Sequence, residues 1–331
     1  MDLAALCLSA FFGLVPMVVY SLGVRSFDRY EKEPWLLLIG TFAWGAILAA
    51  GGAFVINTVM GIGFFLVTGD EGAANLVTGV FVAPLVEETV KGLAVLAVFL
   101  RFRREFDSLL DGILYASMAG FGFAATENLF YIFSFGYLEG GFGGLLFLTA
   151  VRVILVAFQH ALYTSFTGIG LAASRLSRNT PVKLGAPVLG FGAAIFTHSA
   201  HNLLASMGSG LTCLAGTVFD WIGVFGMVAF VIFLISREHR IMAQYLLDEI
   251  AAGLMTEEEY RTACSLGGQF AARWGALGQG RWLRTRRYFD LCGELAFKKY
   301  QLDRFGEERG NTAQVERLRG ELTNLSRGDS M

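Results

Sequence analysis

Long apolar runs alternate with short polar clusters over the first two thirds of the chain. Seven of these runs hold about 20 residues or more, the length that an α-helix needs to cross the ~30 Å hydrocarbon layer of a bilayer. A shorter apolar stretch, residues 60–66, is expected to lie in the membrane interface or to re-enter the membrane. The pattern predicts an all-α, polytopic transmembrane helix bundle of about seven spans, at residues 3–24, 35–58, 77–100, 109–135, 145–173, 184–207 and 214–236.

The charge pattern changes near Ser236. Residues 237–331 carry 15 of the 26 basic and 14 of the 28 acidic side chains. In this part Gly253 follows a short periodic segment, Thr256 precedes Glu259 by three residues as in a capping box, and residues 284–304 have apolar positions at helical spacing. We therefore expect a membrane domain at 1–236 and a C-terminal cytoplasmic helical tail at 237–331, whose role the sequence does not reveal.

Composition and charge agree with a membrane protein. Apolar residues make up 54% of the chain and charged residues only 16%, where a globular protein has about a quarter. The net charge of −2 gives no support to a nucleic-acid partner. Lys and Arg cluster after the first, third and fifth predicted spans, and the intervening loops contain none. Because cytoplasmic loops hold the excess of these residues, we expect the N-terminus outside and the C-terminus in the cytoplasm.

Several ionisable side chains fall inside the predicted spans, where each costs at least ~2.5–3.5 kcal/mol at the membrane centre. At ~1.5 Å per residue, Glu88 and His160 lie about 18 Å from the cytoplasmic ends of their spans, and the corresponding depths are about 21 Å for His198 and about 27 Å for Glu127. Four spans therefore place these side chains in one layer, at or slightly outside the midplane, which predicts a buried site. The ionisable residues in spans are Glu87, Glu88, Lys91, Asp111, Glu127, Arg152, His160, His198, His201 and Asp220.

Spacing within the spans supports the same site. Lys91 follows Glu87 by four residues and Glu88 by three, so it shares their helix face and can neutralise one carboxylate while the other acts. Pro84 removes a backbone hydrogen bond and is expected to kink this helix where the site begins. Small residues at 120–125 allow a neighbouring helix to come close to the same layer.

The remaining polar residues in the spans are expected to support the site or to be structural. Asn202 follows His198 by four residues, so its amide lies beside that imidazole. Arg152 and Asp220 both fall near the outer third of the membrane, where they can form a structural pair with one another. His201 is expected to support the site, and Asp111 to be a residue of the cytoplasmic boundary.

Two hydrolytic chemistries use such a set of side chains. Carboxylates and imidazoles can hold a divalent metal, typically Zn²⁺, with a spare Glu as general base. Alternatively, Glu and His activate water directly while an Asn and a second His stabilise the oxyanion. A proton- or cation-coupled membrane transporter is the alternative of another class, although the sequence contains no mirrored repeat of broken helices. A non-catalytic scaffold would leave the cost of the buried ionisable groups unexplained.

An ordered set of motifs resembles the PrsW family of intramembrane proteases. The set covers about residues 15–235, and His201 departs from it, because members often have an aromatic residue before the last Asn. The motifs are Glu-Glu-x-x-Lys at 87–91, Gly-Phe-Ala-Ala-x-Glu-Asn at 122–128, a buried His160, His-x-x-x-Asn at 198–202, and the loop Asp-Arg-Tyr-Glu-Lys-Glu-Pro-Trp at 28–35.

This resemblance implies a function, a location and roles for individual residues. It implies a site-1 protease of the CAAX protease and bacteriocin-processing superfamily, in the bacterial cytoplasmic membrane, that cuts a membrane-anchored anti-sigma factor. Zn²⁺ is the metal it suggests, and it leaves a metal-free, Glu-activated water open. It implies Glu87, Glu88, Glu127, His160, His198 and Asn202 as catalytic residues, His160, His198 and Glu127 as metal ligands, and Lys91, Asn128 and His201 as supporting residues.

Overall fold

The computed structural model describes residues 2–30, 32–307 and 310–327, and within these ranges the chain is helical with no β-strand. It forms two compact units. The first contains residues 1–26 and 33–230, and the second contains residues 27–32 and the chain from Val231 onward. The all-α fold predicted from the sequence is therefore confirmed, whereas the division at residue 236 stays a prediction.

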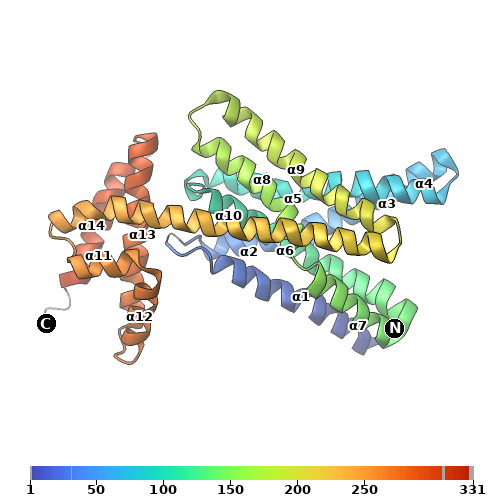
Figure 1. Cartoon of the computed structure of the whole chain (residues 1–331), viewed down its shortest axis with the longest axis horizontal. Helices are drawn as coiled ribbons and strands as arrows, with labels where there is room; N and C mark the ends of the chain where they lie inside the picture. The colour runs from blue at the N-terminus through green and yellow to red at the C-terminus, as the bar shows by residue number, and fades with distance from the viewer. Residues whose placement is uncertain (1, 31, 308–309, 328–331) are drawn as a thin grey trace. The chain divides into compact units, whose positions relative to one another are not determined.

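The first unit is built from long helices, several of which are joined end to end by a π-helical turn (Figure 1). A short 3-10 turn lies in the connection between α5 and α6, and both kinds of turn are written η. The described elements are α1 (Leu3–Arg25), α2 (Trp35–Ala43), η1 (Trp44–Ala49), α3 (Ala50–Thr68), α4 (Glu71–Val77), η2 (Thr78–Val82), α5 (Ala83–Arg101), η3 (Arg103–Glu105), α6 (Leu109–Tyr131), η4 (Ile132–Tyr137), α7 (Leu138–Thr149), η5 (Ala150–Leu155), α8 (Gln159–Leu176), α9 (Thr180–Ser206) and α10 (Gly210–Ala251), whose last part belongs to the second unit.

Five of the described helical segments are long and apolar enough to cross a membrane: α1, Trp35–Thr68, Leu109–Leu176, α9 and α10. The 68-residue segment is long enough for two crossings at about 20 residues each. Helix α5 is not among the five, and it contains Glu87, Glu88 and Lys91 within little more than one turn. The count of seven spans and the location of the tail stay predictions.

Two details differ from the predicted spans. Residues 60–66 are not a separate interfacial or re-entrant element but the last part of α3, which continues until Gly69 adopts a left-handed φ of 65°. The predicted span 145–173 is not one helix either. Its backbone leaves the helical path after η5 at Leu155, and α8 starts only at Gln159. A run of hydrophobic residues indicates that a segment is long and apolar enough to cross a membrane. It does not indicate where the helix within that run is interrupted.

Helix α6 is the centre of the first unit, and its residues from Leu110 to Ala125 are buried on every side. Helices α1, α2, α5 and α8 pack against it. Glycines allow close contact with α8, because a Cβ atom at Gly112 would lie 2.3 Å from the carbonyl oxygen of Gly168. A Cβ atom at Gly120 would lie 2.6 Å from the carbonyl oxygen of His160. The expected role of the small residues at 120–125 is confirmed, and it brings α6 against the backbone of His160.

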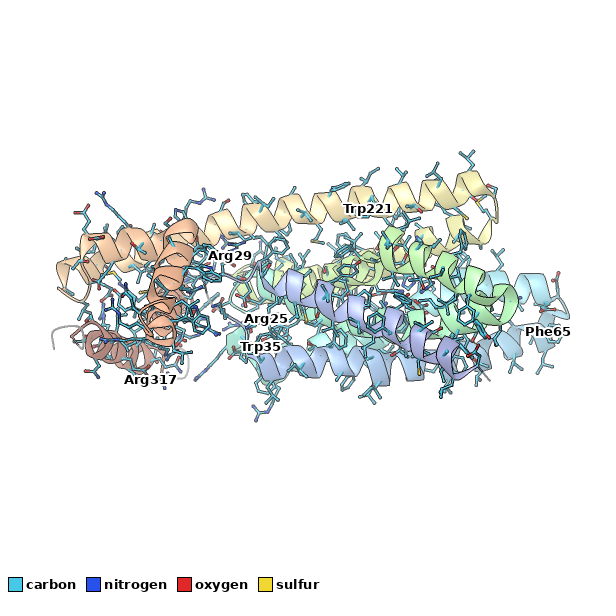
Figure 2. All side chains as sticks on the ribbon, turned by 90° about the horizontal axis from the view of Figure 1, so that it is seen from below. Arg25, Arg29, Trp35, Phe65, Trp221 and Arg317 are labelled. Atoms are coloured by element: carbon cyan, nitrogen blue, oxygen red, sulfur yellow. The ribbon has the colours of Figure 1, made fainter. Side chains whose placement is uncertain are left out.

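The outer surface of the first unit is apolar, as expected for helices that face lipid. Large side chains such as Ile47, Val55 and Leu189 are more than half exposed. The guanidinium of Arg25 lies 3.7 Å from the centroid of the Trp35 ring, where α1 ends and α2 begins, and Figure 2 shows this pair far from Phe65, near the end of α3. Trp and Arg together are typical of a membrane–water interface.

The second unit is a separate helical bundle with its own core. It contains α11 (Glu257–Cys264), α12 (Leu266–Leu277), α13 (Trp282–Phe305) and α14 (Asn311–Arg327), packed with the end of α10 around residues such as Leu246, Leu295 and Leu318. The predicted capping box is present, because Thr256 accepts the backbone N–H of Glu259 and Glu259 accepts that of Thr256. Gly253 has a φ of 70° after the end of α10.

Candidate active site

Three buried side chains from three helices meet inside the first unit. Glu87 comes from α5, His160 from α8 and His198 from α9, and their side chains offer ligand atoms that all lie within 4.8 Å of one another. The exposed fractions are 6% for Glu87 and 3% for each histidine. They belong to the layer of polar residues that the sequence predicts.

Glu88 is a fully buried carboxylate whose oxygens are occupied by three donors. Its Oε1 accepts from Lys91 Nζ at 2.5 Å and from His198 Nδ1 at 2.9 Å. Its Oε2 accepts from Thr164 Oγ1 at 2.9 Å. Because Nδ1 of His198 donates to this carboxylate, the other ring nitrogen, Nε2, is left as an acceptor. Glu88 therefore sets the orientation and the tautomer of His198.

Glu87 differs from its neighbour because one of its oxygens has no hydrogen-bond partner among the described residues. This atom, Oε2, is buried and lies 3.7 Å from His198 Nε2 and 4.0 Å from Lys91 Nζ. The other oxygen, Oε1, accepts a long hydrogen bond of 3.5 Å from Asn57 Nδ2. A buried carboxylate oxygen and an imidazole nitrogen thus face each other without a bond between them.

His160 connects Lys91 to a second carboxylate, Glu127. Its Nδ1 lies 3.2 Å from Lys91 Nζ, and its Nε2 lies 2.8 Å from Glu127 Oε2. Lys91 can only donate, so Nδ1 accepts and Nε2 carries the proton. Arg152 in η5 also donates to Glu127, and its Nε donates to Asn128 Oδ1 at 2.9 Å.

The charges of the site almost cancel. Glu87, Glu88 and Glu127 carry three negative charges when ionised, and two cations, Lys91 and Arg152, are bound among them. With both imidazoles neutral the sum is −1. Charges buried this deeply are stable only when they are paired, and the remaining negative charge suits a positively charged ligand.

The outer members of the predicted set make other contacts. Asn202 Nδ2 donates to the carbonyl oxygen of Gly79 at 2.8 Å and so links α9 to η2. His201 Nδ1 lies 2.7 Å from Asp220 Oδ2, and Tyr163 donates to the other Asp220 oxygen at 2.5 Å. The Tyr163 ring also stacks on His198, with 5.0 Å between ring centroids.

Three expectations can be compared directly with these contacts. The predicted pair of Arg152 and Asp220 is wrong, because Arg152 binds Glu127 and Asp220 binds Tyr163 and His201. Asp111 caps the start of α6 together with Ser108, and its place at the cytoplasmic boundary stays a prediction. Pro84, expected to kink its helix, lies at the start of α5 directly after the π-helical turn η2, and the kink itself stays a prediction.

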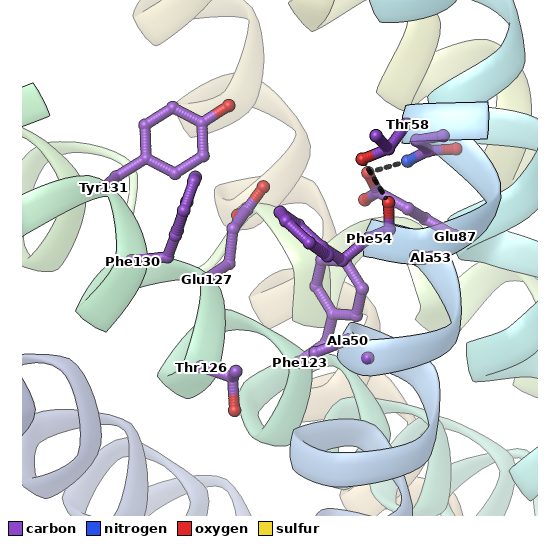
Figure 3. A pocket seen from close by; sticks show the side chains of 12 residues that line it. Ala50, Ala53, Phe54, Thr58, Glu87, Phe123, Thr126, Glu127, Phe130 and Tyr131 are labelled. Atoms are coloured by element: carbon purple, nitrogen blue, oxygen red, sulfur yellow. Dashed lines mark hydrogen bonds between the residues drawn. The ribbon is translucent and has the colours of Figure 1, made fainter. Parts of the chain in front are cut away.

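A cavity of about 380 Å³ opens beside the site and is lined by both Glu87 and Glu127 (Figure 3). Four of its other lining residues are aromatic, among them Phe54, Phe130 and Tyr131. The Phe54 and Phe130 rings meet edge to face at 5.7 Å across the two helices that carry them. The Glu127 side chain is 20% exposed, whereas that of Glu88 is not exposed at all, so the cavity reaches Glu127 and not Glu88.

Sequence reasoning missed three residues of the site and the partner of a fourth. Thr164 and Tyr163 lie four and three residues after His160, so helical spacing from a buried histidine could have found them. Asn57 has an amide side chain in an otherwise apolar run, so the sequence did contain a signal for it. That signal was missed because an amide is not ionisable. The position of Arg152 beside Glu127 depends on the interruption between η5 and α8, which no local pattern reveals.

Fold and site together define a polytopic membrane protein with a buried carboxylate–histidine centre. A family model described as "PrsW family intramembrane metalloprotease" matches residues 33–236. The chain therefore belongs to the PrsW family.

Individual relatives agree with this assignment. "Protease PrsW" of Clostridioides difficile (strain 630) is 37% identical over 122 residues, which are 37% of this chain and 49% of the relative. "Protease PrsW" of Bacillus subtilis (strain 168) is 27% identical over 150 residues, 45% of this chain and 61% of the relative. "Protease PrsW" of Oceanobacillus iheyensis is 26% identical over 202 residues, which are 61% of this chain and 85% of the relative.

The chain thus spans about half the length of the C. difficile relative, and more of the other two. No solved structure matches the chain.

Proposed function

We propose that this protein is an intramembrane endopeptidase that hydrolyses a peptide bond of a membrane-anchored protein. The observation that carries the proposal is the unbonded pair of Glu87 Oε2 and His198 Nε2 beside a cavity. A water molecule between these atoms has two acceptors, which is the arrangement needed to make it a nucleophile. Glu87 is assigned to water activation rather than Glu88, because the oxygens of Glu88 are already occupied.

The residues present fit a divalent metal. Glu87 and His198 would hold it together with His160, one of whose ring nitrogens would have to exchange its contact with Lys91 or Glu127 for the ion. One carboxylate with two imidazoles is a donor set of catalytic zinc sites. The buried Glu87 Oε2 without a partner and the net negative charge support this fit. A bound Zn²⁺ would lower the pKa of its water and polarise the substrate carbonyl. Glu127, which the sequence suggested as a ligand, is instead held by Arg152 and lines the cavity.

The other side chains orient the reacting groups and manage protons. Glu88 holds His198 through Nδ1, as carboxylates behind metal-binding or catalytic histidines do. Arg152 holds Glu127 at the cavity wall, where that carboxylate can take up the proton that Glu87 removes from the water and pass it to the leaving amine. Lys91 neutralises Glu88 and contacts His160.

The substrate is proposed to be an anti-sigma-factor-like protein with one membrane span, cut as the first of two intramembrane cleavages. This part rests on the family resemblance. The distribution of Lys and Arg supports an N-terminus outside and a C-terminal tail in the cytoplasm. The site would then lie at the midplane or in the outer half of the membrane.

The experiment is cleavage of a co-expressed, single-span reporter by Glu87→Gln. We expect a loss of roughly 100-fold or more, since removing a group that activates water costs about 10²–10⁴ in rate. Glu139→Gln is the matched control, because Glu139 is an exposed carboxylate of the same unit. Cleavage by Glu87→Gln at the control rate, at equal amounts of protein in the membrane, would overturn the proposal.

A further inference from the structure

A polar groove starts where the aromatic cavity ends and follows α3 toward its junction with α4. Asn57 and Thr58 line both spaces, so the two adjoin at these residues. The groove has a volume of about 550 Å³, and Thr78 and Asn75 line its opposite side. It reaches Phe65 and Glu71, near the turn that joins α3 and α4.

Two side chains in this groove have buried polar atoms without hydrogen-bond partners among the described residues. They are Asn57 Oδ1 and Thr78 Oγ1, and both line the groove that leads to Glu87. Leaving a buried polar atom unpaired costs about 1–3 kcal/mol, so such atoms are rare and point to a ligand. With the free oxygen of Glu87, three unpaired polar atoms lie along one path.

We infer that the groove binds the main chain of the protein substrate in an extended conformation, with Asn57 and Thr78 as its hydrogen-bonding partners. The inference rests on the proposed function. A helical substrate has its backbone groups bonded internally, and its peptide bond becomes accessible only when the helix unwinds. Unwinding in a membrane leaves N–H and C=O groups without water, so the protein must supply partners. The amide oxygen of Asn57 accepts an N–H, and the hydroxyl of Thr78 donates to a carbonyl.

The dimensions agree with a short bound segment. Asn57 and Phe65 are eight residues apart on one helix, which corresponds to about 12 Å. Three to four residues of an extended chain, at about 3.3 Å each, cover this length. On the far side of Glu87 the wall is aromatic, with Phe54 and Phe130. The substrate site is therefore bipartite, with an extended segment on the polar side of the scissile bond and a large apolar side chain on the other. Such a sequence occurs where a water-exposed stretch becomes a membrane anchor.

The test is Thr78→Val in the purified full chain, with a detergent-solubilised single-span reporter whose cleavage by the wild type is measured. The hydroxyl makes no bond to the described residues, so its removal does not destabilise the fold. Loss of one substrate hydrogen bond of ~1–1.5 kcal/mol raises KM about 5- to 10-fold and leaves kcat unchanged. Thr78→Ser retains the hydroxyl and restores KM.

Thr89→Val is the matched control, because the exposed Thr89 hydroxyl bonds to the carbonyl of Leu85 in its own helix. Its KM stays at the wild-type value. An unchanged KM for Thr78→Val, or a raised KM that Thr78→Ser does not restore, overturns the inference. These results are separate from a failure of the proposed function, which would appear as cleavage by Glu87→Gln.

Discussion

Glu87 and Glu88 are adjacent carboxylates that meet opposite nitrogens of one imidazole, that of His198. Glu88 is bonded to Nδ1 at 2.9 Å, whereas Glu87 Oε2 lies 3.7 Å from Nε2 and makes no hydrogen bond to the described residues. Neighbouring residues of a helix point about 100° apart, so one can face the packed interior while the other faces the cavity. The Glu-Glu pair therefore combines a positioning residue with a reacting one.

This relationship predicts different consequences for the two carboxylates. Glu88→Gln leaves the buried Lys91 without its closest counter-charge, and breaking a buried ion pair costs about 3–5 kcal/mol. We expect a large loss of thermal stability together with low activity. The double variant Glu88→Gln, Lys91→Met removes both charges, so stability recovers while activity stays low because His198 has lost its carboxylate. Thermal unfolding and reporter cleavage measure both effects. Full activity of the double variant would contradict the positioning role of Glu88.

The general fold was predictable from sequence because it depends on simple physical quantities. The length of the apolar runs predicts the membrane helices. The free energy needed to bury an ionisable group in a membrane identifies Glu88, Glu127, His160 and His198 as candidate site residues. The capping box at Thr256 was predictable because it is local. Part of the site also follows from helical spacing, because Lys91 lies on the same helix face as Glu87 and Glu88.

What could not be predicted depends on how separate helices meet. Arg152 reaches Glu127 across the interruption between η5 and α8, and Asp220 binds residues of two other helices. Depth alone suggested that these two charges pair with each other. Depth orders residues along the membrane normal, and it does not say which residues are adjacent within one layer.

The second unit provides a prediction about pH. Burial raises the pKa of the Cys264 thiol and that of the Cys292 thiol. Because the thiolate is the reactive form, both should label at least about tenfold more slowly than a free thiol at pH 8. The same shift makes the stability of this unit depend on pH. The folded unit keeps both thiols protonated while the unfolded chain ionises near pH 8.5, so stability falls as the pH rises above that value.

The measurement is maleimide labelling in a Cys7→Ser, Cys213→Ser background, since those two thiols are exposed. Single Cys264→Ser and Cys292→Ser variants assign each rate, and denatured protein supplies the rate of free thiols. Labelling of the folded chain as fast as the denatured chain at pH 8 would show that burial does not protect these thiols.

Metal binding gives a prediction that does not depend on activity. We expect about one equivalent of Zn²⁺ per purified chain. The bound Zn²⁺ should be lost in the double variant with His160→Ala and His198→Ala, and also in the single variant Glu87→Ala. Zn²⁺ at 100 times its Kd should stabilise the wild type by ~2.7 kcal/mol and leave these variants unaffected. His201→Ala is the matched control, because its imidazole contacts Asp220 instead. Elemental analysis and thermal unfolding are the measurements. Wild-type protein that neither contains Zn²⁺ nor is stabilised by it would favour water activation by Glu87 and His198 alone.

The contact between Arg152 and Glu127 predicts a strong energetic coupling. Arg152→Met leaves the Glu127 carboxylate with only His160 as a polar partner in a largely buried position, so we expect the free energy of unfolding to fall by about 3 kcal/mol. Glu127→Gln alone leaves the guanidinium with Asn128 and the Tyr131 ring, which lies 4.1 Å away, and should cost less. The double variant should be more stable than Arg152→Met, because no uncompensated carboxylate remains. A double-mutant cycle by chemical denaturation measures this coupling. Additive losses would mean that the two charges do not stabilise each other, and retained cleavage by Glu127→Gln would exclude that carboxylate from proton transfer.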